Sequence, residues 1–162
     1  MSFITIPWTS ADSKSALTSY LADKDVAVKL ETHDANTWGF FKLPIGKFLQ
    51  VGYADLGLLP VATVVNDRLL VGIDELLAGY DSSTLEQVFL YRMPSIFHEF
   101  VSLSDPLIVR DEVGFVGISL DGTERWKYLT NGPIDDFEIV GNRIRATTID
   151  GETFTFPLLD DF

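Results

Sequence analysis

A repeat of 37 residues limits the folds open to this chain. Asp74 and Asp111 each end an apolar run, and each is followed 15 residues later by a large aromatic side chain, Phe89 in one copy and Trp126 in the other. The two Asp residues are therefore 37 residues apart, and so are the two aromatic residues. A period of this length indicates one supersecondary unit used more than once, because a single unit cannot bury its own apolar face.

The sequence from residue 26 onward is typical of short strands joined by tight turns. Apolar and β-branched runs alternate with turn residues, and three of the links read Asp121-Gly122, Gly141-Asn142 and Asp150-Gly151. These residues tolerate a positive φ and favour hairpins. Successive hairpins predict a mainly β fold, an antiparallel meander in which residues 26–162 form a β-repeat region, either as an open stack or as a small distorted barrel.

The first 25 residues predict a helix in front of this β region. Thr9 or Ser10 would supply the N-cap oxygen, and Leu17, Tyr20 and Leu21 share one face at helical spacing. We therefore expect residues 1–25 to be an N-terminal helix segment. With 162 residues and no linker of biased composition, the chain is expected to form a single domain, 1–162.

Both copies carry an Asp in a turn before the large aromatic residue. Phe89 follows Asp81 by eight positions, and Trp126 follows Asp121 by five. This arrangement resembles the blade repeat of PQQ-like β-propellers, although Leu85 stands where that repeat usually has Gly and Phe89 where it usually has Trp. The resemblance implies that the Asp residues cap turns and that the aromatic residues dock between neighbouring sheets.

The number of repeats sets a limit on this resemblance. Propellers have about four to eight blades, whereas residues 26–162 hold two clear copies and three to four at most. A closed ring with a central cofactor pocket is therefore not expected, and the family's cofactor and dehydrogenase activity are not carried over. We predict no cofactor.

The net charge of −12 is unevenly distributed along the sequence. Residues 1–73 carry 7 acidic and 6 basic side chains, whereas residues 74–162 carry 17 acidic and 6 basic ones. Such a field repels nucleic acids and anionic membranes and attracts a basic protein. The absence of Cys, of a membrane-length apolar run and of a signal-peptide pattern favours a cytoplasmic location.

Motifs for catalysis or metal binding are weak. His98 lies in an aromatic strand, where simple alternation places Phe97 and Glu99 on one face and His98 on the other. A hydrogen-bonded, half-buried histidine is the favoured interpretation, since an acid–base role needs a partner residue. Consecutive acidic pairs point to opposite faces of a strand and suit neither a carboxylate dyad nor a metal site. We predict no catalytic residue and no metal site.

The candidate partner-binding residues lie in two acidic turns and in the aromatic segment that joins the two copies. They are Asp74, Glu75, Asp111, Glu112, Tyr91, Phe97, His98 and Glu99. These features predict a non-catalytic protein-interaction module, most concretely an acidic inhibitor or immunity-type protein that neutralises a basic protein such as a nuclease toxin.

The alternative is a small-ligand-binding domain or cryptic enzyme, with a pocket near Tyr53–Pro60 and His98. Open sheet edges would also allow the chain to form a homo-oligomer.

Overall fold

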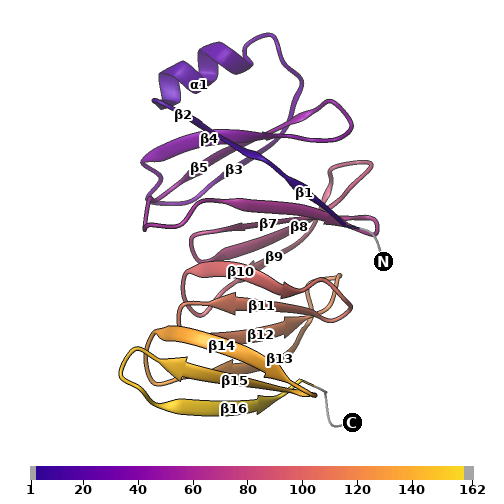
Figure 1. The fold of residues 1–162 in the computed structure, drawn as a ribbon. Helices are drawn as coiled ribbons and strands as arrows, with labels where there is room; N and C mark the ends of the chain where they lie inside the picture. The colour runs from indigo at the N-terminus through magenta and orange to yellow at the C-terminus, as the bar shows by residue number, and fades with distance from the viewer. Residues whose placement is uncertain (1–2, 159–162) are drawn as a thin grey trace. The chain divides into compact units, whose positions relative to one another are not determined.

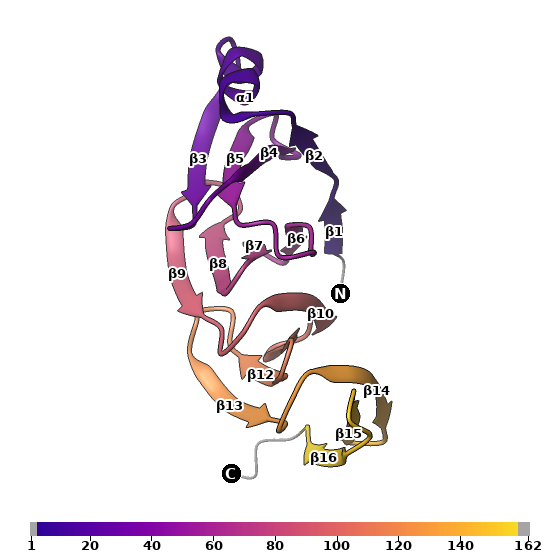
Figure 2. The ribbon, with the colours of Figure 1, turned by 90° about the vertical axis from the view of Figure 1, so that its left-hand side faces the viewer.

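The computed structural model describes residues 3–158 and divides the chain into two compact units, Met1–Arg92 and Met93–Phe162. Each unit contains two β-sheets (Figures 1 and 2).

Residues 3–92 of the first unit form nine strands and one helix. They are β1 (Phe3–Ile6), β2 (Trp8–Ala11), α1 (Lys14–Leu21), β3 (Val26–Glu31), β4 (Thr37–Lys42), β5 (Phe48–Tyr53), β6 (Val61–Val65), β7 (Arg68–Ile73), β8 (Leu76–Asp81) and β9 (Gln87–Arg92). One sheet has the strand order β1-β6-β7-β8-β9 and is here named the β7 sheet. The other has the order β2-β4-β5-β3 and is named the β4 sheet.

The core of the first unit lies between these two sheets. Phe41, Leu49 and Val51 of the β4 sheet belong to the same buried cluster as Leu69 and Val71 of the β7 sheet. Alternation along each strand directs these side chains to one face, so the two sheets bury their apolar faces against each other. Helix α1 adds a second, smaller cluster in which Leu17 and Leu21 pack with Phe40 and Phe48.

The start of the chain differs from the expectation of a helix segment over residues 1–25. Residues 3–11 form β1 and β2, and α1 begins at Lys14 with Ser13 as its N-cap. The Ser13 hydroxyl accepts a hydrogen bond from the Ala16 N–H at 3.0 Å. Thr9 and Ser10 lie instead in β2, paired with Phe40 and Gly39 of β4. A helix-capping pattern is defined by neighbouring residues. The partner strand of β2 lies about 30 residues away in the sequence, so the residues around the cap give no information about this pairing.

One pair of strands departs from the antiparallel meander. β3 lies parallel to β5, with Leu30 opposite Val51, and it forms an edge of the β4 sheet. The other pairs in the described part of the chain are antiparallel. Turn chemistry identifies hairpins but gives no signal for a parallel pair, because its two strands are joined by a crossover connection.

Residues 93–158 of the second unit form seven strands. They are β10 (Phe97–Ser102), β11 (Leu107–Asp111), β12 (Gly114–Ile118), β13 (Glu124–Leu129), β14 (Ile134–Val140), β15 (Arg143–Thr148) and β16 (Thr153–Pro157). The first four make one sheet in chain order, the β11 sheet, and the last three make another, the β15 sheet. Their shared core contains Phe115 and Trp126 from one sheet and Ile134, Ile144 and Ala146 from the other.

A glycine lies opposite a large aromatic residue in both copies of the repeat. Gly79 pairs with Phe89 across β8 and β9, and Gly117 pairs with Trp126 across β12 and β13. A Cβ atom at either glycine would overlap the aromatic ring. The missing side chain therefore lets each ring lie across the backbone of the neighbouring strand.

The fold is mainly β with one short helix near the N-terminus, which confirms the predicted fold class. Each described sheet has two different edge strands, so residues 3–158 form open sheets and not a closed barrel. The predicted tight hairpins are also confirmed, with φ of 91° at Gly122, 62° at Gly141 and 87° at Gly151. The single-domain assignment stays a prediction. Helix α1 is too short and too polar to cross a membrane.

Candidate functional site

The predicted residues Asp74 and Glu75 form the β7–β8 turn of the first unit. Asp74 has a positive φ of 45°, and its Oδ2 accepts hydrogen bonds from the Thr32 hydroxyl at 2.7 Å and from the Ala54 N–H at 2.9 Å. Asp74 thus links the turn of the β7 sheet to two segments that follow strands of the β4 sheet. Glu75 forms an ion pair with Arg92 at 3.3 Å.

This turn contributes to an open groove of about 450 Å³. The groove is lined on one side by Asp74, Glu75, Leu76 and Arg92, and on the other by Thr32, His33, Asp34, Ala54 and Leu56. His33 and Asp34 are exposed. Part of the Tyr53–Pro60 segment therefore lines a groove together with an acidic turn. His98 belongs to the second unit.

Asp111, the equivalent of Asp74 in the second copy, is fully buried at the β11–β12 turn. Its Oδ2 accepts a hydrogen bond from the Ser95 N–H at 2.8 Å, and its Oδ1 accepts one from the Val113 N–H at 2.9 Å. Burial raises the pKa of this carboxyl, and the backbone N–H groups oppose that shift. Both copies thus use an Asp to bind the backbone N–H of a segment that precedes the turn.

The predicted residues Phe97, His98 and Glu99 lie on β10 beside this turn, but their side chains point differently from the prediction. Phe97 pairs with Asp111 and Glu99 with Arg110, so His98 is an extra residue at a β-bulge. The bulge resets the alternation. Phe97 consequently contacts Phe100, with ring centroids 5.0 Å apart, instead of sharing a face with Glu99. Glu99 forms an ion pair with Arg110 at 3.6 Å.

His98 is surrounded by charged groups of its own unit. Burial lowers its pKa and Arg110 lowers it further, whereas Glu112, Asp111 and Glu99 oppose the shift. The structure therefore brings together five of the eight candidates, namely Phe97, His98, Glu99, Asp111 and Glu112. Asp74, Glu75 and Tyr91 belong to the first unit.

This cluster lacks the hydrogen bonds of a catalytic triad. Ser95, His98 and Asp111 are of the right types, but the Ser95 hydroxyl donates to Glu112 at 3.4 Å and the Ser95 N–H donates to Asp111. Among the described residues, His98 makes no hydrogen bond with a side chain of either residue. Within residues 3–158, no three His, Asp or Glu side chains are grouped so that they could hold a metal ion.

The four residues predicted to be structural lie in turns and in cores. Asp81 and Asp121 accept hydrogen bonds from the N–H groups of Ser83 and Thr123, two residues further on. Phe89 is buried over Gly79, and Trp126 stacks on Tyr128 in the second core, with ring centroids 4.9 Å apart.

The uneven charge of the sequence, with 17 acidic and 6 basic side chains over residues 74–162, lies mainly on the second unit. Residues 93–162 hold 13 acidic and 5 basic side chains, a net charge of −8, whereas residues 1–92 hold 11 and 7, a net charge of −4. The described part of the second unit exposes nine carboxylates and four basic side chains. Its exposed acids include Asp135, Asp136 and Glu138 of β14, Asp150 and Glu152. The sequence showed this excess of acidic residues but did not single out Asp135, Asp136 or Asp150 as candidate binding residues.

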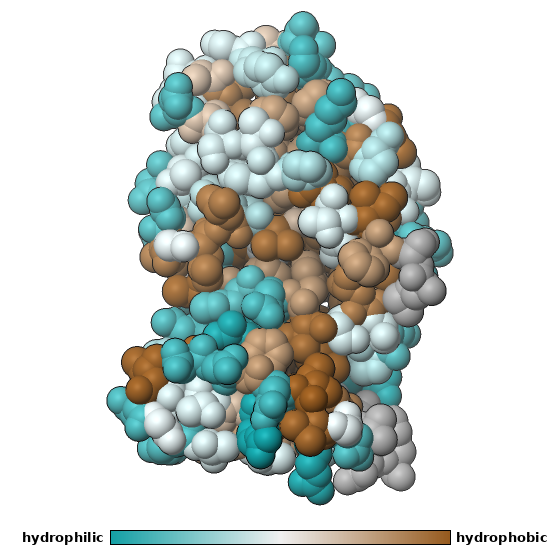
Figure 3. Space-filling view, in the orientation of Figure 1, coloured by the Kyte–Doolittle hydropathy of each residue, from teal (hydrophilic) through white to brown (hydrophobic). Residues whose placement is uncertain are grey.

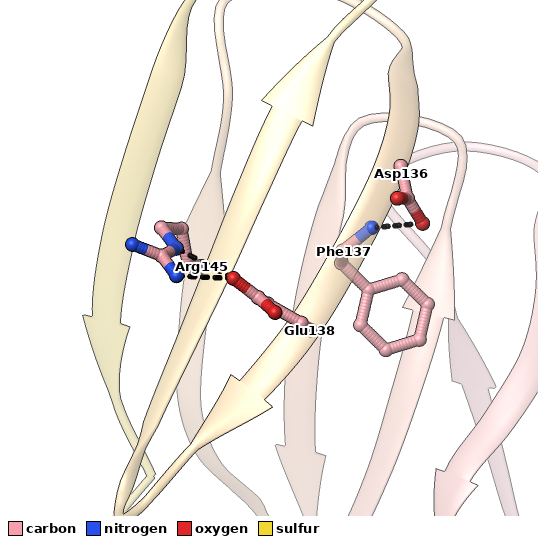
Figure 4. Close-up of polar contacts among 4 residues, drawn as sticks. All are labelled: Asp136, Phe137, Glu138 and Arg145. Atoms are coloured by element: carbon pink, nitrogen blue, oxygen red, sulfur yellow. Dashed lines mark hydrogen bonds and ion pairs between the residues drawn. The ribbon is translucent and has the colours of Figure 1, made fainter.

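Figure 4 shows the contacts of two of these acidic residues of β14, Asp136 and Glu138. Glu138 lies opposite Arg145 of β15 and forms an ion pair with it, and the Arg145 Nε donates to Glu138 at 2.8 Å. Asp136 accepts a hydrogen bond from the Phe137 N–H at 2.8 Å. The neighbouring residue Asp135 is exposed.

No protein-family model matches the chain, and no curated protein matches its sequence. Among solved structures, 18 chains match it. One of them, the crystal structure of the computationally designed Ika4 protein, has a TM-score of 0.50 and 7% sequence identity, and the match covers 85% of this chain and 93% of that one. At this identity the similarity concerns the fold alone.

Proposed function

We propose that the chain is a non-catalytic protein-interaction module, an acidic inhibitor or immunity-type protein that binds a basic partner protein. The observation that carries this proposal is the acidic surface of the second unit, where nine exposed carboxylates outnumber four exposed basic side chains. Surface charges of one sign attract a protein of the opposite sign and raise the rate of association. The same field repels nucleic acid and anionic lipid.

The hydrogen bonds of the His98 cluster support a role without chemistry. Both carboxylate oxygens of Asp111 accept backbone N–H groups, so this residue holds a turn and does not orient His98. Glu99 is paired with Arg110, and Ser95 is bonded to Glu112. The charged residues of this cluster therefore stabilise the β11 sheet, and the proposal assigns partner binding to exposed carboxylates outside the cluster, such as Asp135, Asp136 and Asp150.

The experiment is affinity capture from the native source at low salt, followed by kinetics with the purified partner. We expect one basic protein in stoichiometric amount, released by high salt. The triple variant Asp135→Asn, Asp136→Asn, Asp150→Asn should lower the association rate constant by roughly tenfold in stopped-flow measurements at low salt.

A matched control, Asp12→Asn, Asp25→Asn, Asp34→Asn, removes the same charge from the first unit and should change the rate much less. Equal rates for the two triple variants, or no basic protein captured at low salt, would contradict the proposal.

The groove of the first unit favours a second candidate function, the binding of a small polar ligand. It combines carboxylates, His33 and Arg92 with a volume suited to a small molecule. A ligand bound there would raise the melting temperature, and Glu75→Gln together with Arg92→Gln would remove that shift.

A further inference from the structure

Asn131 and Gly132 lie in the loop that joins β13 to β14 in the second unit. Of the four asparagines in the chain, Asn131 alone precedes a glycine. In such a pair the backbone nitrogen of the glycine can attack the side-chain amide of the asparagine, because glycine has no side chain that hinders the approach. Whether this nitrogen is free to react depends on the hydrogen bonds of the loop.

Hydrogen bonds anchor this loop on both sides of the pair and leave the nitrogen of Gly132 free. The Thr130 N–H donates to the Val113 carbonyl oxygen at 2.7 Å, and the Ile134 N–H donates to the Glu112 carbonyl oxygen at 2.8 Å. Within residues 3–158, the Gly132 N–H itself donates no hydrogen bond. No partner in this part of the chain therefore holds the nitrogen away from the side chain that precedes it.

Two other glycines of the second unit follow an Asp residue, which can form the same kind of ring, but their nitrogens are hydrogen-bonded. The Gly122 N–H donates to the Ser119 carbonyl oxygen at 2.9 Å, and the Gly151 N–H donates to the Thr148 carbonyl oxygen at 2.9 Å. Each of these bonds closes a tight turn. Gly132 differs from both glycines because its N–H is not used in this way.

The side chain of Asn131 is accessible to water. Asn131 is exposed, and hydrophilic side chains cover much of the visible surface over the neighbouring strand β14 (Figure 3). Its Nδ2 donates to Glu152 Oε2 at 3.4 Å, which is long for a hydrogen bond. The side-chain amide is thus neither buried nor held by a short contact.

We propose that Asn131 is a site of spontaneous deamidation. The Gly132 nitrogen gives up its proton to hydroxide and bonds to Cγ of Asn131. The bond between Cγ and Nδ2 then breaks, and the amide takes up a proton from water and leaves as ammonia. Water adds to one of the two carbonyl carbons of the resulting succinimide and opens it to aspartate or isoaspartate. Both products add a negative charge to the acidic surface of the second unit, and isoaspartate also adds a methylene group to the main chain.

Mass spectrometry of the aged full chain tests this site. Trypsin cleaves after Lys127 and Arg143, so one peptide holds both Asn131 and Asn142 and the second asparagine is an internal control. After ageing of the folded chain, fragmentation of this peptide should locate a gain of about 1 Da at Asn131 and none at Asn142. The rate should rise several-fold for each unit of pH, because the Gly132 nitrogen must lose a proton before it attacks.

A synthetic peptide of residues 128–143 gives the reaction rate without the fold. The folded chain should react within about tenfold of this rate, as expected for a loop that is open to solvent. Gly132→Ala is the matched variant of the chain. Its added Cβ would meet only Asp150 Oδ2, at 4.0 Å, so the fold accommodates it, and the new methyl group should slow deamidation by about tenfold. Circular dichroism checks that the variant is folded.

Three results would overturn this inference. A folded chain that reacts more than about a hundredfold more slowly than the peptide would show that the fold protects Asn131. An equal mass gain at Asn142 would show that the following glycine is not the cause. An unchanged rate in Gly132→Ala would show that the Gly132 nitrogen is not the attacking atom. The inference does not depend on the proposed function, because the reaction needs only this chain and water.

Discussion

Asp81 and Asp111 show how local surroundings shift the pKa values of two carboxyl groups in opposite directions. The Asp81 Oδ1 accepts hydrogen bonds from the Ser83 hydroxyl, the Ser83 N–H and the Thr84 N–H, and these bonds lower its pKa from 3.8 to about 2. Asp111 also accepts backbone N–H groups, but burial dominates and raises its pKa. Hydrogen bonds to an exposed carboxylate favour the charged form, whereas loss of water disfavours it.

The lowered pKa of Asp81 predicts a pH-dependent contribution to stability. The unfolded chain binds this proton more tightly than the folded chain, so the contribution is present above pH 4 and is lost as the pH falls from about 4 to about 2. Asp81→Asn should therefore lower the melting temperature at pH 6, and the difference from the parent chain should vanish near pH 2. Differential scanning calorimetry over this range measures it.

The exposed Asp34→Asn serves as the control for general charge effects. A difference between the parent chain and Asp81→Asn that persists unchanged at pH 2 would show that the Asp81 carboxylate does not act through its charge.

For single residues, the sequence predicts the contacts of a side chain when its partners are close to it in the chain. The turns at Asp81 and Asp121 depend on residues two or three positions away, so the Asp-containing repeat points to them. The bulge at His98 depends on the register between β10 and β11. Alternation read from one strand alone therefore placed Phe97 and Glu99 on the same face, which is wrong.

At the scale of elements, prediction succeeded for hairpins of the repeat and failed for long-range pairs. Strands β9 and β13 hold the two aromatic residues of the repeat, Phe89 and Trp126, and each follows the Asp-containing turn that the repeat predicts. β1 pairs with β6, and β2 with β4, so neither could be found from neighbouring residues. The N-cap of α1 is Ser13 and not the predicted Thr9 or Ser10, because residues 8–11 form β2 and pair with β4.

The pairing of Gly117 with Trp126 gives a prediction for β12 and β13. In Gly117→Ala the new Cβ would overlap the indole ring, so Trp126 must leave its position in the second core. Overpacking of this kind costs about 1–3 kcal/mol in the free energy of unfolding. Urea denaturation should show this loss, together with a red shift of the tryptophan fluorescence.

Gly132→Ala is the matched control, because a Cβ there would meet only Asp150 Oδ2, at 4.0 Å. A loss of stability no larger than that of Gly132→Ala would show that the ring can move aside without cost.

At the scale of the whole molecule, the two compact units differ in charge more than in architecture. Each has two sheets and a buried core, but the net charge is −4 for residues 1–92 and −8 for the shorter segment 93–162. Repulsion among like charges destabilises a compact state, and it is screened by salt over a Debye length of about 10 Å at 0.1 M. The second unit should therefore depend more strongly on ionic strength than the first.

The chain carries its own reporters for this difference. Trp8 and Trp38 lie in the first unit and Trp126 in the second, so ¹⁹F NMR of the chain labelled with 5-fluorotryptophan follows both units in one sample. Raising NaCl from about 20 mM to about 500 mM should raise the unfolding midpoint at Trp126 by a few degrees, since about 1 kcal/mol shifts the midpoint by about 4–8 °C in a segment of this size. The midpoints at Trp8 and Trp38 should move less. Equal shifts at all three residues would mean that the units unfold together and that the charge of the second unit is not a separate determinant of stability. A larger shift at Trp126 would show that the carboxylates of the second unit repel one another in the free chain. A basic partner would then relieve this repulsion on binding.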